Sequence, residues 1–196
     1  MDVCQQEWGE EFSRQIEGWG AACWAETGEL RKLLWEAGVT LRAGDVRWTA
    51  AQATVVGEAV QRIADRFDGK ARPLVGGVTL ILQSQASPWW APLWRWWNRK
   101  PAGYRFGAYQ NRGKICVTPS YVNVGGLVHE LGHYYDEKQR LSRAYQAHVK
   151  QAGLELETNR FEDFANAFAA YVLDRPLAAA RRGYLEQLRI QQPGIG

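Results

Sequence analysis

The chain contains few residues that form covalent cross-links. Among its 196 residues are three cysteines, at positions 4, 23 and 116, and no pair has C-x-x-C spacing. An odd and widely spaced set excludes a disulfide framework as the basis of the fold. It is typical of free thiols in a reducing compartment, which favours the cytoplasm, with Cys116 expected to lie buried in a strand.

Long apolar runs are also absent. No stretch reaches the roughly 20 apolar residues that a membrane-spanning helix needs. The first residues have neither the basic nor the apolar region of a secretory signal. We therefore expect no transmembrane segment.

Charge of either sign forms no long block. The formal net charge is +3, and the basic and acidic residues are mixed along the chain. This pattern argues against a nucleic-acid partner. There are no internal repeats, and the length is that of one domain. We expect an N-terminal helical region at 1–70, which can belong to the same domain, and a catalytic-type core at 71–196.

The hydrophobic periodicity predicts helices, then a small sheet, then helices. Helices are expected at 3–37 with a break at Gly18 and Gly20, from the Thr49 cap to 67, and at 125–138, 141–152, 159–173 and 176–191. Strands are expected at 74–83, 104–110 and 114–118, the last two joined by a tight turn at 111–113, and 39–46 is expected to be a connector. This order predicts an α+β fold with helices packed on one face of a short mixed sheet.

The most informative segment, 127–136, reads LVHELGHYYD and contains an H-E-x-x-H motif. On a helix, residues four apart share one face, so His129 and His133 can offer two imidazole nitrogens to one metal ion. Glu130 can then reach a water on that metal as a general base, and zinc is the ion that suits this arrangement. This metal site requires the segment to be a helix, and Asn123 is the candidate for its N-cap.

A catalytic zinc of this kind needs a third protein ligand. The metzincin position for a third histidine is Gln139 here, and the glycine expected before it is Asp136, so that class is excluded. The remaining histidine, His148, stands in the next predicted helix, where a lone histidine is more often a surface or packing residue.

The better candidate is Glu162, in the predicted helix that reads FEDFANAFAAY. On that helix Glu162, Ala165, Asn166 and Ala169 share a face, small apart from Glu162 and Asn166, that can lie close to the metal helix. Glu162 would ligate the metal and Asn166 could orient a ligand. Asp163 is expected to be a first-turn acid that stabilises the helix dipole, and this is also the alternative for Glu162.

With these motifs the sequence resembles the gluzincin metallopeptidases, in particular the catalytic domain of the anthrax lethal factor type and the compact ImmA/IrrE-type peptidases. The resemblance covers about 104–176. It implies a zincin-like fold, His129, His133 and Glu162 as zinc ligands, Glu130 as catalytic base, and a substrate cleft lined by one of the strands before the metal helix.

Several further residues are candidates for supporting roles. Peptide hydrolysis needs a group that stabilises the oxyanion, and Tyr121, Tyr134, Tyr135 and His148 are all eligible. Asp136 could bind a ligand imidazole or be a solvated helix acid. The sequence does not choose among them.

The chain is rich in tryptophan, and half of its ten tryptophans fall in the loop 88–97 together with arginine. This loop could be a lid, a protein-binding patch, a membrane or nucleic-acid contact, or a part of the core. Two functions therefore stand at this point: a zinc-dependent endopeptidase acting on a protein or peptide, and a non-catalytic, metal-containing binding protein that recognises a partner through this loop.

Overall fold

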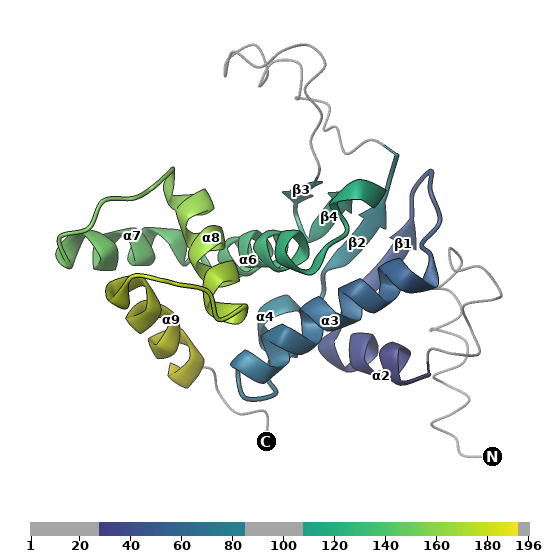
Figure 1. Ribbon diagram of the computed structural model, residues 1–196, viewed down its shortest axis with the longest axis horizontal. Helices are drawn as coiled ribbons and strands as arrows, with labels where there is room; N and C mark the ends of the chain where they lie inside the picture. The colour runs from purple at the N-terminus through teal and green to yellow at the C-terminus, as the bar shows by residue number, and fades with distance from the viewer. Residues whose placement is uncertain (1–27, 85–107, 192–196) are drawn as a thin grey trace, which may run out of the picture.

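The computed structural model of the protein describes residues 28–84 and 108–191 (Figure 1). In chain order the elements are α2 (Gly28–Ala37), β1 (Thr40–Ala43), α3 (Ala50–Arg66), α4 (Ala71–Val75), β2 (Thr79–Leu82), β3 (Ala108–Asn111), β4 (Lys114–Val117), the short 3-10 helix η2 (Pro119–Tyr121), α6 (Val124–Gln139), α7 (Ser142–Gln151), α8 (Arg160–Val172) and α9 (Ala179–Gln191).

The four described strands form one mixed sheet in the order β1-β2-β4-β3. The pairs β1–β2 and β2–β4 are parallel, and β3 adds to β4 in antiparallel direction at the edge. The hairpin between β3 and β4 turns through Arg112 and Gly113, whose φ angles of 47° and 78° are those of a type I′ turn. The helices lie on one face of this sheet (Figure 1), so the expected mixture of helices with a small mixed sheet is confirmed.

One hydrophobic core joins the sheet to the helices. In β2, Leu80 and Leu82 are fully buried, whereas Thr79 and Ile81 between them are only partly buried, as expected for a strand with one face on the core. Helix α3 contributes Val56, Val60 and Ile63, among others, to the same core. Elements on both sides of residue 70 thus share one core, because β1 pairs with β2.

Two helices begin where the sequence predicts a capping residue. The Thr49 hydroxyl accepts a hydrogen bond from the Gln52 amide over 3.2 Å, and the Gln52 side chain accepts one from the Thr49 amide over 3.0 Å. This reciprocal capping box satisfies two backbone donors at the start of α3. Asn123 likewise caps α6.

Within residues 28–84 and 108–191 the structure differs from the sequence-based expectation at three places, whereas the predicted helical segment 3–27 and the first part of the predicted strand 104–110 lie outside the described residues. The predicted connector 39–46 contains strand β1, which is too short to show alternation and forms because β2 offers it a parallel partner. The first part of the predicted strand 74–83 is instead helix α4, which tolerates Pro73 in its first turn. The last helix begins at Ala179 rather than at Pro176.

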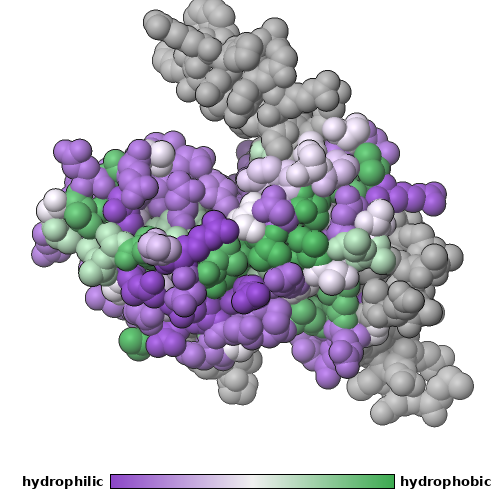
Figure 2. Space-filling view, in the orientation of Figure 1, coloured by the Kyte–Doolittle hydropathy of each residue, from purple (hydrophilic) through white to green (hydrophobic). Residues whose placement is uncertain are grey.

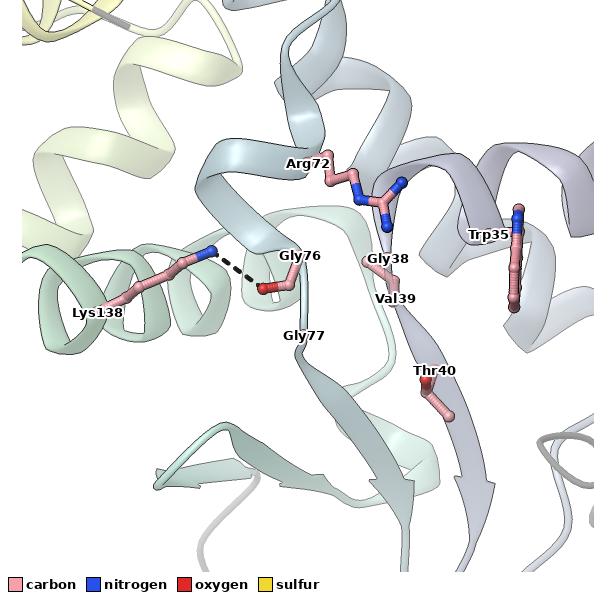
Figure 3. Close-up of a pocket in the computed structure, with 8 residues that line it drawn as sticks. All are labelled: Trp35, Gly38, Val39, Thr40, Arg72, Gly76, Gly77 and Lys138. Atoms are coloured by element: carbon pink, nitrogen blue, oxygen red, sulfur yellow. Dashed lines mark hydrogen bonds between the residues drawn. The ribbon is translucent and has the colours of Figure 1, made fainter. Parts of the chain in front are cut away.

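Strands β1 and β2 begin at closely approaching glycines. Gly38 and Gly77 have φ angles of +69° and +92°, which side-chain-bearing residues rarely adopt. The Gly77 amide donates a hydrogen bond to the Gly38 carbonyl over 2.8 Å. A pocket opens at this end of the two strands (Figure 3).

None of the helices in the described residues combines the length and the apolar character needed to cross a membrane. Cys116 is a buried free thiol in β4, as predicted, whereas Cys4 and Cys23 lie outside the described residues.

Candidate metal centre

Helix α6 brings the two motif histidines together. Asn123 accepts a hydrogen bond from the Gly126 amide over 2.8 Å, which fixes the start of the helix two turns before His129. His133 follows one turn later, so both rings point to the same side. Their Nε2 atoms lie 3.1 Å apart, with the ring planes at 87°.

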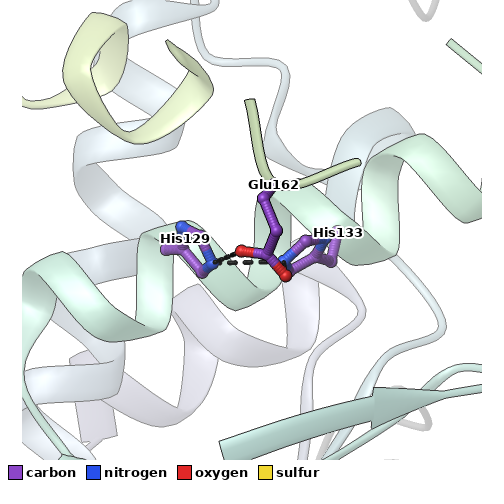
Figure 4. A group of neighbouring side chains, drawn as sticks. All are labelled: His129, His133 and Glu162. Atoms are coloured by element: carbon purple, nitrogen blue, oxygen red, sulfur yellow. Dashed lines mark hydrogen bonds and ion pairs between the residues drawn. The ribbon is translucent and has the colours of Figure 1, made fainter. Parts of the chain in front are cut away.

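Glu162 reaches the same point from α8 (Figure 4). Its Oε2 lies 3.3 Å from Nε2 of His129, and its Oε1 lies 3.4 Å from Nε2 of His133. Both imidazoles are mostly buried, whereas the Glu162 side chain is 46% exposed. The three residues predicted as metal ligands are therefore brought together, and they could hold a metal ion because their ligand atoms all lie within 4.8 Å of one another.

Close packing of α6 on α8 makes this convergence possible. Gly132 stands between the two histidines, and a Cβ atom there would lie 3.0 Å from Cδ1 of Phe168 and 3.3 Å from Cα of Ala165. The small-residue face that the sequence predicts on α8 thus meets a glycine on α6. Because Gly132 has no side chain and Ala165 has only a methyl group, the two helices lie close enough for Glu162 to reach both histidines.

The charges at the centre are arranged to keep Glu162 ionised. Hydrogen bonds from His129 and His133 hold the pKa of the Glu162 carboxyl far below its usual range. Burial lowers the pKa of His133, but its hydrogen bond and charge interaction with Glu162 outweigh this, and the net direction is upward. Two imidazole nitrogens that face each other need a shared proton or a cation between them, since two lone pairs would repel.

Glu130 lies buried beside the two histidines, with only 6% of its surface exposed. Burial raises the pKa of its carboxyl, and the charges of His133 and His129 oppose that rise. Among the described residues its one hydrogen bond comes from the Tyr121 hydroxyl, over 3.3 Å. A buried carboxylate with a single neutral donor is unfavourable for stability, and such groups are typical of functional sites.

Tyr121, one of four candidates for oxyanion stabilisation, is thus placed at the centre. Its ring packs on Gly126, where a Cβ atom would lie only 2.9 Å from Cε1 of Tyr121. Burial, followed by the negative charge of Glu130, raises the pKa of the Tyr121 hydroxyl well above its usual value. The hydroxyl is therefore a hydrogen-bond donor at any physiological pH.

The other three oxyanion candidates point elsewhere. The Tyr134 hydroxyl donates to the Gly76 carbonyl over 2.7 Å, and Tyr135 is fully buried against Phe164 and Phe168. His148 lies on α7, with its ring 5.5 Å from that of Tyr184.

The two predicted supporting residues, Asp136 and Asn166, also have other surroundings. Asp136 is buried, and its Oδ1 accepts a hydrogen bond from the Ser142 amide over 2.6 Å, so it joins α6 to the start of α7. Its charge still contributes to the raised pKa of His133. Asn166 is exposed on α8, and its side chain makes no hydrogen bond to any other described residue.

Asp163 has a larger role than the sequence suggests. It is 2% exposed, and its carboxylate accepts hydrogen bonds from Arg181, from the Tyr145 hydroxyl and from the Glu157 amide. Asp163 is a first-turn acid of α8, as predicted, and it is in addition the buried partner of Arg181. The sequence did not predict this ion pair because α9 contains several arginines, and nothing in the sequence identifies Arg181 as the partner of Asp163.

Figure 2 shows the surface hollowed between the part that carries α7 and α8 and the part that carries the strands. Strand β3 runs along α6, and the Gln110 side chain donates a hydrogen bond to Glu137 of that helix. The tryptophan-rich loop 88–97 lies outside the described residues.

Comparison with known proteins adds no assignment. No protein-family model matches the chain, and no curated protein matches its sequence. The function must therefore be argued from the site itself.

Proposed function

We propose that the protein is a zinc-dependent endopeptidase with a zincin-like fold, in which His129, His133 and Glu162 hold the metal and Glu130 is the general base. The observation that carries the proposal is the convergence of the three ligand side chains: the two imidazole Nε2 atoms lie 3.1 Å apart, and they lie 3.3 and 3.4 Å from the two carboxylate oxygens of Glu162, one oxygen each. Zinc binds nitrogen and oxygen ligands at about 2.0–2.2 Å in a tetrahedron, whose edges are then roughly 3.3–3.6 Å. The observed separations come close to that geometry.

The donor set also suits a catalytic rather than a purely structural site. Two neutral imidazoles and one carboxylate leave a fourth position open, whereas structural zinc sites are closed by four protein ligands, usually including cysteine. Cys116 is buried in β4 and is not part of the group formed by His129, His133 and Glu162. When bound, zinc would polarise the scissile carbonyl and lower the pKa of its water to about 7.

Glu130 would move the proton in this reaction. A raised pKa brings a carboxylate closer to the pH at which it works, so that it can accept a proton and later release it. In peptide hydrolysis Glu130 would take the proton of the attacking water and deliver it to the leaving amine. The Tyr121 hydroxyl would orient Glu130 and is available to donate to the developing oxyanion.

The edge strand β3 would position the substrate. It is one of the two edge strands of the described sheet, β1 being the other, and it is the edge strand that contacts α6. An extended peptide can add to such an edge through main-chain hydrogen bonds, which hold many different sequences in one orientation. This supports an endopeptidase that binds its substrate as an additional strand above α6.

Metal analysis combined with proteolysis tests the proposal. The purified protein, loaded with zinc and dialysed, is analysed by inductively coupled plasma mass spectrometry as wild type, Glu130→Gln and Glu162→Ala. We expect one zinc per chain in wild type and in Glu130→Gln, and loss of zinc in Glu162→Ala. Glu155→Ala, which removes an exposed carboxylate shortly before α8, is the matched control and should keep its zinc.

Activity is then measured by mass spectrometry on an unfolded protein mixture. Wild type should release new peptide termini, and Glu130→Gln should not. Full zinc occupancy in Glu162→Ala would remove that residue from the site. Zinc binding without any cleavage that depends on Glu130 would favour the non-catalytic, metal-containing binding protein instead.

A further inference from the structure

A pocket lies at the start of strands β1 and β2 (Figure 3). The pocket has a volume of about 480 Å³, and its lining includes Trp35, Thr40, Arg72 and Lys138. Lys138 follows His133 by five residues, which places it about 140° further around the helix. The pocket is thus independent of the proposed zinc ligands.

The charged groups of this lining are all positive. Arg72 and Lys138 supply two cations, and no carboxylate residue is among the residues that line the pocket. Figure 3 shows the Arg72 guanidinium group turned toward the space beside Gly38. Within the described residues Arg72 has no ion pair, so its donors are available to a ligand.

The Lys138 side chain is fixed at the pocket by a hydrogen bond to the backbone. Its Nζ donates a hydrogen bond to the Gly76 carbonyl over 3.1 Å, and the Tyr134 hydroxyl donates to the same oxygen over 2.7 Å. An ammonium group has three donors, so two remain for another acceptor. Within the described residues Lys138 forms no ion pair, and burial lowers the pKa of its ammonium group.

The remaining walls are suited to a flat apolar group. The Trp35 indole stands on the side of the pocket opposite Lys138 (Figure 3), and Val39 lies between them. Gly38, Gly76 and Gly77 also line the pocket, where they present backbone only. A Cβ atom at Gly77 would lie 3.2 Å from the Tyr134 hydroxyl, so a side chain there would crowd Tyr134.

We propose that this pocket binds a small molecule that joins an anionic group, phosphate or carboxylate, to a planar ring. Arg72 and Lys138 would hold the anion, with the Thr40 hydroxyl as a further donor, and the Trp35 indole would pack on the ring. The volume is in the range typical of small-molecule sites, and a guanidinium fork matches the oxygens of either anion. The proposal does not depend on the proposed peptidase function.

Titration calorimetry with four probes tests the site in the zinc-loaded protein: phenyl phosphate, benzoate, inorganic phosphate and phenol. We expect saturable binding of phenyl phosphate or benzoate, weaker binding of inorganic phosphate, and none of phenol. Whether phenyl phosphate or benzoate binds more tightly identifies the anion. Affinity should fall with added salt, because exposed charge interactions are screened.

Variants locate the binding. Loss of a charge-assisted hydrogen bond should weaken phenyl phosphate or benzoate at least about tenfold in Arg72→Ala and in Lys138→Ala. Trp35→Leu should reduce the preference for these ligands over inorganic phosphate. Arg143→Ala, which removes an exposed cation from α7, is the matched control and should bind as wild type does.

Thermal unfolding verifies that each variant is folded, and Arg72→Gln replaces Arg72→Ala if the latter is not. Absence of saturable binding for all four probes would overturn the proposal. Equal affinity in wild type, Arg72→Ala and Lys138→Ala would do the same. Because no step of this experiment measures proteolysis, its failure and the failure of the peptidase proposal can be told apart.

Discussion

The guanidinium group of Arg181 donates two hydrogen bonds to the buried carboxylate of Asp163, from Nη2 to Oδ1 over 3.1 Å and from Nε to Oδ2 over 3.3 Å. Asp163 directly follows Glu162 in the first turn of α8. Adjacent carboxylates on one helix thus face different partners: one meets the histidines of α6, and the other ties α8 to α9. The second interaction fixes the part of α8 from which Glu162 projects.

Breaking this pair should destabilise the whole protein. Arg181→Ala leaves Asp163 buried without its main partner, and removal of one member of a buried ion pair typically reduces the free energy of unfolding by about 3–5 kcal/mol. Urea unfolding followed by circular dichroism measures the change. Arg62→Ala, which breaks an exposed pair with Glu58, should reduce it by no more than about 0.5 kcal/mol. Equal small effects in both variants would contradict a structural role for Asp163.

The same carboxylate predicts a loss of stability in acid. Burial raises the pKa of Asp163, but hydrogen bonds from Arg181, the Glu157 amide and Tyr145 outweigh it, and the pKa is lowered on folding. The unfolded value is about 3.9. Its contribution to stability is therefore complete above roughly pH 5 and is lost as the pH falls through the folded pKa.

We expect the free energy of unfolding to fall more steeply between pH 5 and pH 3 in wild type than in Asp163→Asn. Carbon-13 NMR of the Asp163 carboxyl gives the folded pKa directly. A folded pKa at or above 3.9 would contradict this account.

Local patterns predicted most of the elements around the site. The H-E-x-x-H spacing and the Asn123 cap sufficed for α6, and the run of small residues beside Glu162 correctly indicated where α8 meets it. Strand β1 was missed because four residues cannot show a period, and its strand conformation depends on pairing with β2. Nor could the sequence choose Tyr121 among its eligible neighbours, since its position depends on the 3-10 helix η2 that turns it back over α6.

Gly132 should limit how closely α8 can approach the histidines. In an ordinary helix, replacing glycine with alanine stabilises by about 0.5–1 kcal/mol. In Gly132→Ala the new Cβ would press on Phe168 and on the Ala165 backbone, and neither can move far because both are buried. We expect a net destabilisation of about 1–3 kcal/mol and weaker zinc binding, measured by urea unfolding and by competition with a chelator.

Gly183→Ala is the matched control for this prediction. Gly183 lies in α9, and nothing stands within 4 Å of a Cβ atom there. This variant should be slightly more stable than wild type and should bind zinc equally well. If Gly132→Ala behaves as Gly183→Ala does, tight packing of α6 on α8 does not set the position of Glu162.

The contact between Tyr121 and Glu130 should matter for catalysis but not for metal binding. Tyr121→Phe removes the hydrogen bond to the buried carboxylate and the candidate oxyanion donor, so we expect kcat to fall roughly 100-fold or more. Zinc content should stay at one per chain, because Tyr121 contacts no proposed ligand through a hydrogen bond.

Gly126→Ala tests the same contact without changing the hydroxyl. The added methyl group would lie 2.9 Å from the Tyr121 ring and must displace it, which lengthens the bond to Glu130. Activity should therefore fall while zinc content is unchanged, and Gly183→Ala is again the control. Because Tyr121→Phe and Gly126→Ala disturb one contact, combining them should lower kcat little more than Tyr121→Phe alone. Full activity in Tyr121→Phe would leave Glu130 to act without this partner and would exclude Tyr121 from the mechanism.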